Sequence, residues 1–525
     1  MEICRLFHKF FKQEKPDSDH KLKQPMDRIF KYSLLVLSLF LIAAQIWHVF
    51  NFSIWTDDAC FGSVAKNLAN GNGYYSTAFE ENFLFDPWIS LGPIVILPAT
   101  LFVKIFGNQH WVPGITIVTL IWILLLTIFV NFKSEKKWFC SFLALLLCLL
   151  FSINVENYGI YNSDQFSLWY LMLGEIPAIL LTILGALILF QNRMLLGGLV
   201  LGLAIMCKTL SGIACITIIL VNAARIFFTH QKGGEKDFKK KFTLILLSGL
   251  GFVAPFFLFE LVKIISLGWN SYYEIQLKNT LFYKQIALVE SARPLEKIFQ
   301  LFRIFGCSLF LLLALAGYLV KTSNQRKDHI FYWLGIALII CFFLHSLWWI
   351  FFSVFVNYRY FIAALFYCIF GISFLICGTK LHTKKLIALI SLLILFRQES
   401  LDYLVLHAFT KNEKLDEQLL ITKKISELQQ DGISIISCGL NFELEYLLPK
   451  TRNFADCQNL PDKLPRHQFI LVNDFVTFGE FVAPGKILMK NSNTSTVIKE
   501  PPSIISARCD EEYLTTKTFS LSWCK

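Results

Sequence analysis

Apolar segments of about membrane-spanning length recur along most of this 525-residue chain. A helix needs about 20 such residues to cross the hydrocarbon core of a bilayer, and inside that core only helices or closed barrels can pair every backbone polar group. Only 17% of the residues are charged, against roughly 25% in soluble domains. The sequence therefore predicts a polytopic, all-α membrane protein.

The loops between the apolar segments predict the topology. The segments fall near 30–50, 88–106, 112–131, 138–153, 169–190, 194–207, 210–228, 242–264, 302–320, 330–350, 357–378 and 386–404. Short basic connections stay in the cytoplasm, and here these are 133–137, 191–193, 229–241, 321–328 and 378–385. They account for most of the net charge of +11, so this charge requires no nucleic-acid partner.

Segment 88–106 contains the step Gly92-Pro93 and a second proline, Pro98. Proline interrupts a continuous straight helix, so we interpret 88–106 as a re-entrant or interfacial helix. About eleven transmembrane helices then remain, with the amino end in the cytoplasm and the carboxyl end outside. The alternative is that 88–106 spans the membrane and that 133–137 lies outside.

The chain is expected to have three parts. Residues 1–29 form a cytoplasmic N-terminal segment, and residues 30–407 form the transmembrane domain, whose first external loop is 51–111. Beyond 408 the charge rises, and helix-like 412–430 precedes strand-like 433–437 and 469–472, which predicts a small external soluble α/β domain. Oxidising conditions would allow disulfides among its cysteines, which are Cys438, Cys457, Cys509 and Cys524.

Asp57 and Asp58 stand just past the first apolar segment. Ionisable residues at a membrane are costly and usually functional, so this pair is a candidate site. A structural role is the alternative, because one carboxylate suits a helix N-cap and the other suits the first turn. Thr56 is another candidate cap.

The sequence that follows the pair resembles the first external loop of GT-C glycosyltransferases. The resemblance is to the branch that contains protein O-mannosyltransferases and the lipid A aminoarabinose transferase, which usually has Asp-Glu where this chain has Asp57-Asp58. Trp88 replaces a second proline of that branch. The matching residues, in order, are Asp57-Asp58-Ala59, Ala65, Asn67-Leu68, Gly71, Gly73-Tyr74, Asp86-Pro87-Trp88, Lys104-Ile105-Phe106-Gly107, Gly174-Glu175-Ile176-Pro177, Lys208 and Asn357-Tyr358-Arg359-Tyr360.

This resemblance implies a GT-C-like fold and an inverting membrane glycosyltransferase. A sugar would pass from a polyprenyl-phosphate donor to a lipid, glycan or protein acceptor on the external face of the membrane. Asp57 would be the general base, and Asp58 or Glu175 would orient the acceptor or raise the pKa of the base. The donor phosphate would be bound by Lys208, Arg359 and Tyr360. No cofactor is required; a divalent cation between the acidic groups stays open, because no spacing demands one.

Other interpretations stay open. Glu175 suits a first-turn acid of a helix, and Lys208 and Arg359 suit snorkelling side chains at a membrane surface. As whole-protein alternatives we consider a transporter or flippase of lipid-linked glycans, a ligase that joins them, and a sensor whose output is the tail. The predicted external cysteines and the absence of an ER-retention tail favour a bacterial inner membrane, with the site and the tail in the periplasm.

Overall fold

The computed structural model describes most of the chain. The described residues are 19–76, 84–86, 89–132, 134, 136–152, 168–228, 235–289, 293–323, 330–353, 359–378, 390–410, 413–430, 434–438, 441–448, 454–456, 469–474, 509–515 and 519–524.

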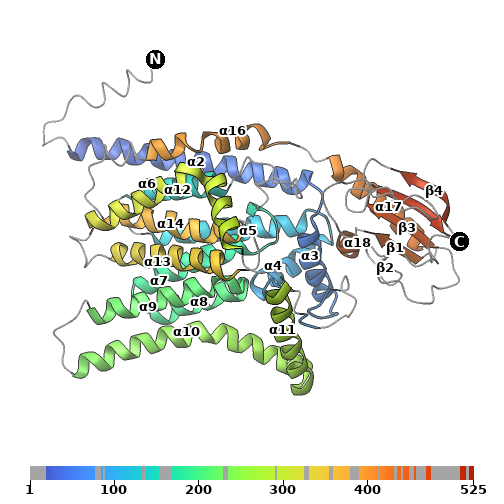
Figure 1. Cartoon of the computed structure of the whole chain (residues 1–525), viewed down its shortest axis with the longest axis horizontal. Coiled ribbons are helices and arrows are strands. Elements are labelled where there is room, and N and C mark those ends of the chain that lie inside the picture. The colour runs from blue at the N-terminus through green and yellow to red at the C-terminus, as the bar shows by residue number, and fades with distance from the viewer. Residues whose placement is uncertain are drawn as a thin grey trace, which may run out of the picture.

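Long helices lie side by side and form a bundle, with a small sheet at one end of it (Figure 1). The helices of the bundle are α2 (Asp19–Asn51), α5 (Val112–Asn131), α6 (Lys137–Ser152), α7 (Glu175–Phe190), α8 (Met194–Cys207), α9 (Gly212–Phe228), α10 (Glu235–Leu267), α12 (Pro294–Ser323), α13 (Ile330–Phe351), α14 (Arg359–Gly378) and α16 (Gln398–His407).

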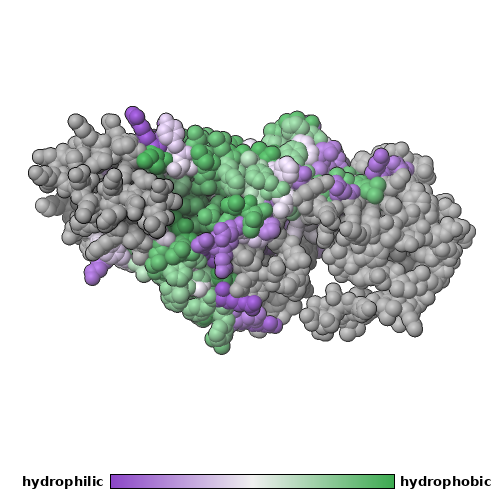
Figure 2. Space-filling model, turned by 90° about the horizontal axis from the view of Figure 1, so that it is seen from above, coloured by the Kyte–Doolittle hydropathy of each residue, from purple (hydrophilic) through white to green (hydrophobic). Residues whose placement is uncertain are grey.

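Burial differs between the centre and the edge of this bundle. Every residue of α7 is buried, as expected for a helix that is apolar on all sides. At the edge, α10 exposes large apolar side chains such as Phe257 and Ile265, and apolar residues cover much of the helical surface in Figure 2. An apolar surface of this kind is suited to contact with lipid.

Within the described part of the chain, seven helical stretches are long and apolar enough to cross a membrane. They are Arg28–Asn51, Val112–Asn131, Thr209–Phe228, Phe238–Leu267, Pro294–Thr322, Ile330–Phe351 and Arg359–Cys377. Four shorter apolar helices cover Pro93–Phe106, Lys137–Ser152, Glu175–Phe190 and Met194–Cys207. The prediction of a polytopic helical membrane protein is confirmed, whereas the number of about eleven spans stays a prediction.

The segment predicted to be re-entrant contains α4 (Pro93–Phe106), a helix of 14 residues. At 1.5 Å per residue it is about 21 Å long, shorter than the hydrocarbon core of about 30 Å. The Gly92-Pro93 step marks the start of the helix, and Pro98 lies inside it. The helix thus continues through Pro98, at the cost of the backbone hydrogen bond that a proline nitrogen cannot donate. A re-entrant or interfacial position for α4 stays a prediction.

Two further helices, α3 (Thr56–Ala69) and α11 (Trp269–Val289), lie at the end of the bundle nearest the sheet (Figure 1). We call this end, which also holds the start of α4, the site end of the bundle.

The C-terminal region contains α17 (Glu413–Gln430), α18 (Asn441–Leu447) and a five-stranded sheet in the order β2-β1-β3-β5-β4. Strand β1 pairs in parallel with β2 and β3, whereas β5 is antiparallel to β3 and β4. The strands are β1 (Ser434–Cys438), β2 (Phe454–Asp456), β3 (Phe469–Asp474), β4 (Cys509–Thr515) and β5 (Phe519–Cys524).

The elements α17, β1 and β3 lie where the sequence predicts a helix and two strands. That the region forms a separate domain, and the other predicted boundaries, stay predictions. The predicted disulfides involve side chains outside the described part of the structure.

Candidate functional site

Helix α3 presents the acidic pair. Trp55 occupies its N-cap position, and Asp57 and Asp58 lie in its first turn, where negative charge is favourable to the helix dipole. Neighbouring residues of a helix do not share a face. The side chain of Asp57 is accordingly 45% exposed, whereas Asp58 is buried.

Asp57 forms an ion pair with the first residue of α14. Arg359 Nη1 lies 3.3 Å from Asp57 Oδ2, and Arg359 Nη2 donates a hydrogen bond of 3.0 Å to the hydroxyl of Tyr360. The Arg359 side chain is 27% exposed, so the pair is open to solvent. A partly exposed pair contributes little to stability, and an incoming anion can compete with Asp57 for the guanidinium.

A second ion pair joins Lys208 to Glu175. Lys208 Nζ lies 3.5 Å from Glu175 Oε1 and donates hydrogen bonds to the Leu173 carbonyl at 3.1 Å and to Ser90 Oγ at 3.3 Å. Both side chains are almost fully buried, at 11% and 6% exposed. This cation is therefore held in place by an acid at the amino end of α7 and by two neutral acceptors.

Lys208 stands at a break between two helices. Helix α8 ends at Cys207, Lys208 is extended (φ −151°, ψ 119°), and a 3-10 turn, η3 (Thr209–Ser211), leads into α9. The sequence predicts apolar segments that end at 207 and resume at 210, on either side of this break. The extended residue projects its side chain at the site end rather than along a continuous helix.

Two glycines let three chain segments meet beside Lys208. The amide of Gly92 donates to the carbonyl of Cys207 at 3.1 Å, and a Cβ added at Gly92 would lie only 1.6 Å from the Met206 carbonyl oxygen. Gly174 adopts a left-handed φ of 77°, a conformation that suits glycine. The starts of α4 and α7 can thereby approach the end of α8.

The two ion pairs belong to one cluster. Besides Asp57 and Tyr360, the carboxylate of Glu175 stabilises the charge of Arg359 electrostatically. Lys208 Nζ also lies 6.0 Å from the ring centroid of Phe61, a residue of α3. The structure brings all the predicted site residues to the site end, namely Asp57, Asp58, Glu175, Lys208, Arg359 and Tyr360. Their chemical roles stay predictions.

The carboxylate of Asp58 has a different partner from that of Asp57. Its Oδ1 accepts a hydrogen bond from the backbone amide of Met172, in the segment that leads into Glu175. Burial raises the pKa of Asp58 to about 8; the Met172 hydrogen bond opposes this rise, and the charge of Asp57 adds to it. Asp58 thus links α3 to the segment that leads into α7.

Two basic side chains accompany these acids. Among the residues that the structure describes, no group of three or more His, Cys, Asp or Glu side chains is placed to hold a metal ion. Lys208 and Arg359 supply the positive charge next to Glu175 and Asp57.

Sequence reasoning missed several contributors. Ser90 accepts a hydrogen bond from Lys208, the Phe61 ring lies beside Lys208, and helix α18 packs against α3. An isolated serine, an apolar residue on an amphipathic helix and a short helix in the tail carry no motif, so the sequence held no signal for them.

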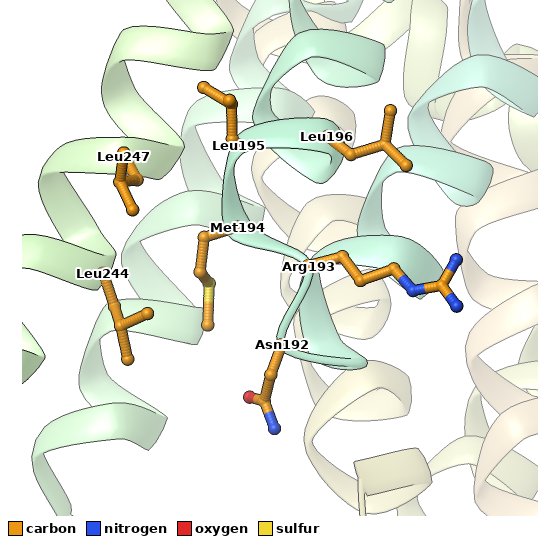
Figure 3. A pocket seen from close by; sticks show the side chains of 7 residues that line it. All are labelled: Asn192, Arg193, Met194, Leu195, Leu196, Leu244 and Leu247. Atoms are coloured by element: carbon orange, nitrogen blue, oxygen red, sulfur yellow. The ribbon is translucent and has the colours of Figure 1, made fainter.

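A hollow of about 400 Å³ lies elsewhere, between the α7–α8 turn and α10 (Figure 3). Its lining is mainly apolar and contains none of the predicted site residues; the lining residues are Asn192, Arg193, Met194, Leu195, Leu196, Leu244 and Leu247. The hollow therefore contributes nothing to this candidate site.

Together, the helical bundle and the charged cluster at its site end define a polytopic membrane protein with a combined acidic and basic site. The fold is similar to that of ArnT from Cupriavidus metallidurans bound to undecaprenyl phosphate, with a TM-score of 0.52 and 9% identity over 94% of this chain and 98% of that chain. The apo structure of ArnT from the same organism gives a TM-score of 0.51 and 10% identity over 94% and 97%.

An oligosaccharyltransferase from Archaeoglobus fulgidus, in complex with zinc and sulfate, is more distant, with a TM-score of 0.42 and 11% identity over 79% of this chain and 61% of that one. No family model matches the chain, and no curated protein matches it. The likeness to ArnT shows that this chain has a GT-C-like fold along nearly its whole length.

Proposed function

We propose that this protein is a membrane glycosyltransferase that moves a sugar from a polyprenyl-phosphate-linked donor to a lipid, glycan or protein acceptor. One observation carries the proposal: an exposed carboxylate, Asp57, is paired with Arg359, and the Glu175–Lys208 pair belongs to the same cluster. The ArnT structure with the same fold holds undecaprenyl phosphate, which supports a polyprenyl phosphate as the carrier. The working face is proposed to be external, in the periplasm of a bacterial inner membrane.

Lys208 and Arg359 are proposed to bind the donor phosphate. Charge-assisted hydrogen bonds from an ammonium and a guanidinium to phosphate are among the stronger polar contacts in proteins. In this structure Glu175 and Asp57 neutralise the two cations. A phosphate arriving at Arg359 displaces the solvent-exposed Asp57, and the freed carboxylate then becomes available to the acceptor.

The transfer step follows from this exchange of partners. The acceptor hydroxyl attacks the anomeric carbon on the side opposite the phosphate, so the configuration inverts. The bond from that carbon to the phosphate oxygen breaks, its electron pair leaves with the polyprenyl phosphate, and the acceptor proton passes to Asp57 as general base. Lys208 and Arg359 stabilise the charge that grows on the leaving phosphate. Glu175 orients Lys208, and Asp58 positions the segment before Glu175.

The test is the release of polyprenyl phosphate when the purified full-length protein is incubated with a panel of polyprenyl-phosphate sugars and candidate acceptors. We expect one sugar to give acceptor-dependent release and Asp57→Asn to abolish it, with the protein still inserted in the membrane. Glu296→Gln is the matched control, because Glu296 is an exposed acid in an ion pair with Arg293 that lies outside the cluster. Full activity of Asp57→Asn would remove the catalytic assignment.

A further inference from the structure

Helix α18 of the C-terminal region lies against α3, the helix that carries Asp57. Thr56 Oγ1 donates a hydrogen bond of 3.0 Å to Glu443 Oε1, and Thr56 is the residue immediately before Asp57. Further along α3, Lys66 Nζ donates to the backbone carbonyls of Leu448, at 2.6 Å, and of Glu445. These carbonyls lie at the end of α18, where a cation stabilises a helix. Both ends of α3 are thus attached to the same short helix.

Tyr446 of α18 is fully buried and packs on α3 at Gly62, between Thr56 and Lys66. A Cβ added at Gly62 of α3 would lie 2.9 Å from the Tyr446 ring, so the ring packs directly on the α3 backbone. The Tyr446 hydroxyl donates to the Gln109 carbonyl at 3.1 Å, and Asn108 Nδ2 donates to the Tyr446 carbonyl at 2.8 Å. Helix α18 therefore packs between α3 and the turn that precedes α5.

A second tether from the same region holds the chain just upstream of α3. Gln418 of α17 accepts from the amide of Ile54 at 3.0 Å and donates to the Ile54 carbonyl at 3.3 Å. This paired contact is buried. The C-terminal region therefore fixes the chain on the amino-terminal side of Asp57 as well as α3 itself.

Such support matters because α3 is short. An isolated helix of 14 residues is only marginally stable in water, and helices of this length depend on packing. A displacement of about 1 Å at a reacting group costs on the order of 100-fold in rate. The side chain of Asp57 must therefore be held by contacts outside its own helix if it is to act as a base.

We propose that α18 is the positioning element of the site, and that Glu443, acting through Thr56, fixes the start of α3 so that Asp57 faces Arg359. Glu443 is a positioning residue and does not touch substrate. The expected effect on the rate of transfer rests on the proposed glycosyl transfer. The expected effect on the position of α3 does not. The C-terminal region is then a required part of the enzyme and not an independent appendage.

The experiment uses four full-length variants. Glu443→Ala and Thr56→Val each remove the hydrogen bond, whereas Glu443→Gln and Thr56→Ser keep an acceptor and a hydroxyl. We expect the first two to lower kcat by roughly 10- to 100-fold with the donor KM unchanged, because Lys208 and Arg359 are untouched. The Gln and Ser variants should retain wild-type kcat. Combining Glu443→Ala with Thr56→Val should add no further loss, since both remove the same contact.

Hydrogen exchange of the α3 backbone amides provides a readout that needs no substrate. Faster exchange in Glu443→Ala and Thr56→Val, with wild-type exchange in the Gln and Ser variants, supports the positioning role. Should the wild type release no polyprenyl phosphate from any donor while α3 exchange still rises in these variants, the proposed function fails and the positioning role stands. Unchanged kcat and unchanged α3 exchange in both disruptive variants would overturn the inference. If Glu443→Ala fails to accumulate in the membrane, Thr56→Val decides, because it removes the same bond from the other side.

Discussion

Replacing Asp58 with asparagine removes a buried ionisable group and keeps the shape of the side chain. Burial raises the pKa of Asp58 to about 8, against 3.8 for an exposed aspartate; the Met172 hydrogen bond opposes this rise and Asp57 adds to it. The pKa in the folded protein is therefore above the unfolded value, and between these two values the native state binds more protons. The contribution of Asp58 to stability then falls as the pH rises from about 4 to about 8.

The size of this effect follows from the two pKa values. At about 1.4 kcal/mol for each pH unit, the difference between 3.8 and about 8 costs the native state roughly 5 kcal/mol at the alkaline end of the window. Asparagine resembles the protonated acid, and its carbonyl oxygen can still accept from the Met172 amide. We expect Asp58→Asn to be more stable than the wild type near pH 8 and to show a flatter dependence on pH.

The assay is thermal unfolding of the detergent-solubilised protein between about pH 5 and about pH 8, the range in which this linkage acts. Asp58→Ala is the control, because it removes the titrating group and also the acceptor of the Met172 amide, and it should be less stable than Asp58→Asn by about 1–3 kcal/mol at every pH. If the wild type and Asp58→Asn lose stability with pH at the same rate, Asp58 is already ionised in the native state and the reasoning is refuted.

Two further substitutions test how Lys208 is held. Gly92→Ala places a Cβ 1.6 Å from the Met206 carbonyl oxygen, so we expect the end of α8 to shift and the rate of sugar transfer to fall by about 100-fold. The control, Gly249→Ala, adds a Cβ that meets nothing within 4 Å and should keep full activity. Equal rates in the two variants would contradict the close approach of Gly92 to Met206. Lys208→Met removes a proposed phosphate ligand, so we expect binding of labelled polyprenyl phosphate to weaken by at least about tenfold, since charged hydrogen bonds contribute about 1.5–3 kcal/mol; undiminished binding would exclude a phosphate contact at Lys208.

Several features of the fold follow from local sequence. Apolar runs predict the long helices because a membrane admits little other backbone structure, and each of the seven helical stretches long enough to span a membrane overlaps such a run. The interruption between 207 and 210 predicts the break at Lys208. Pro98 was a weaker guide, because a single proline removes one hydrogen bond and a packed helix can continue through it.

The pairing of the site residues lies beyond local reasoning. Asp57 and Arg359 are 302 positions apart, and no periodicity or spacing connects them. The predicted topology and the resemblance to GT-C enzymes both put them on the external face, but neither pairs one with the other. The contact of Asp58 with Met172 was equally hidden, since its partner is a backbone amide. Glu443 and Tyr446 look like ordinary residues of a short helix, and their importance appears only when α18 is seen packed on α3.

The most direct test of the account is an experimental structure of the protein with a bound polyprenyl phosphate. We predict that the phosphate lies within hydrogen-bonding distance of both Lys208 Nζ and the Arg359 guanidinium, and that Asp57 has separated from Arg359. A phosphate bound away from both cations, with the Asp57–Arg359 pair intact, would contradict the central claim.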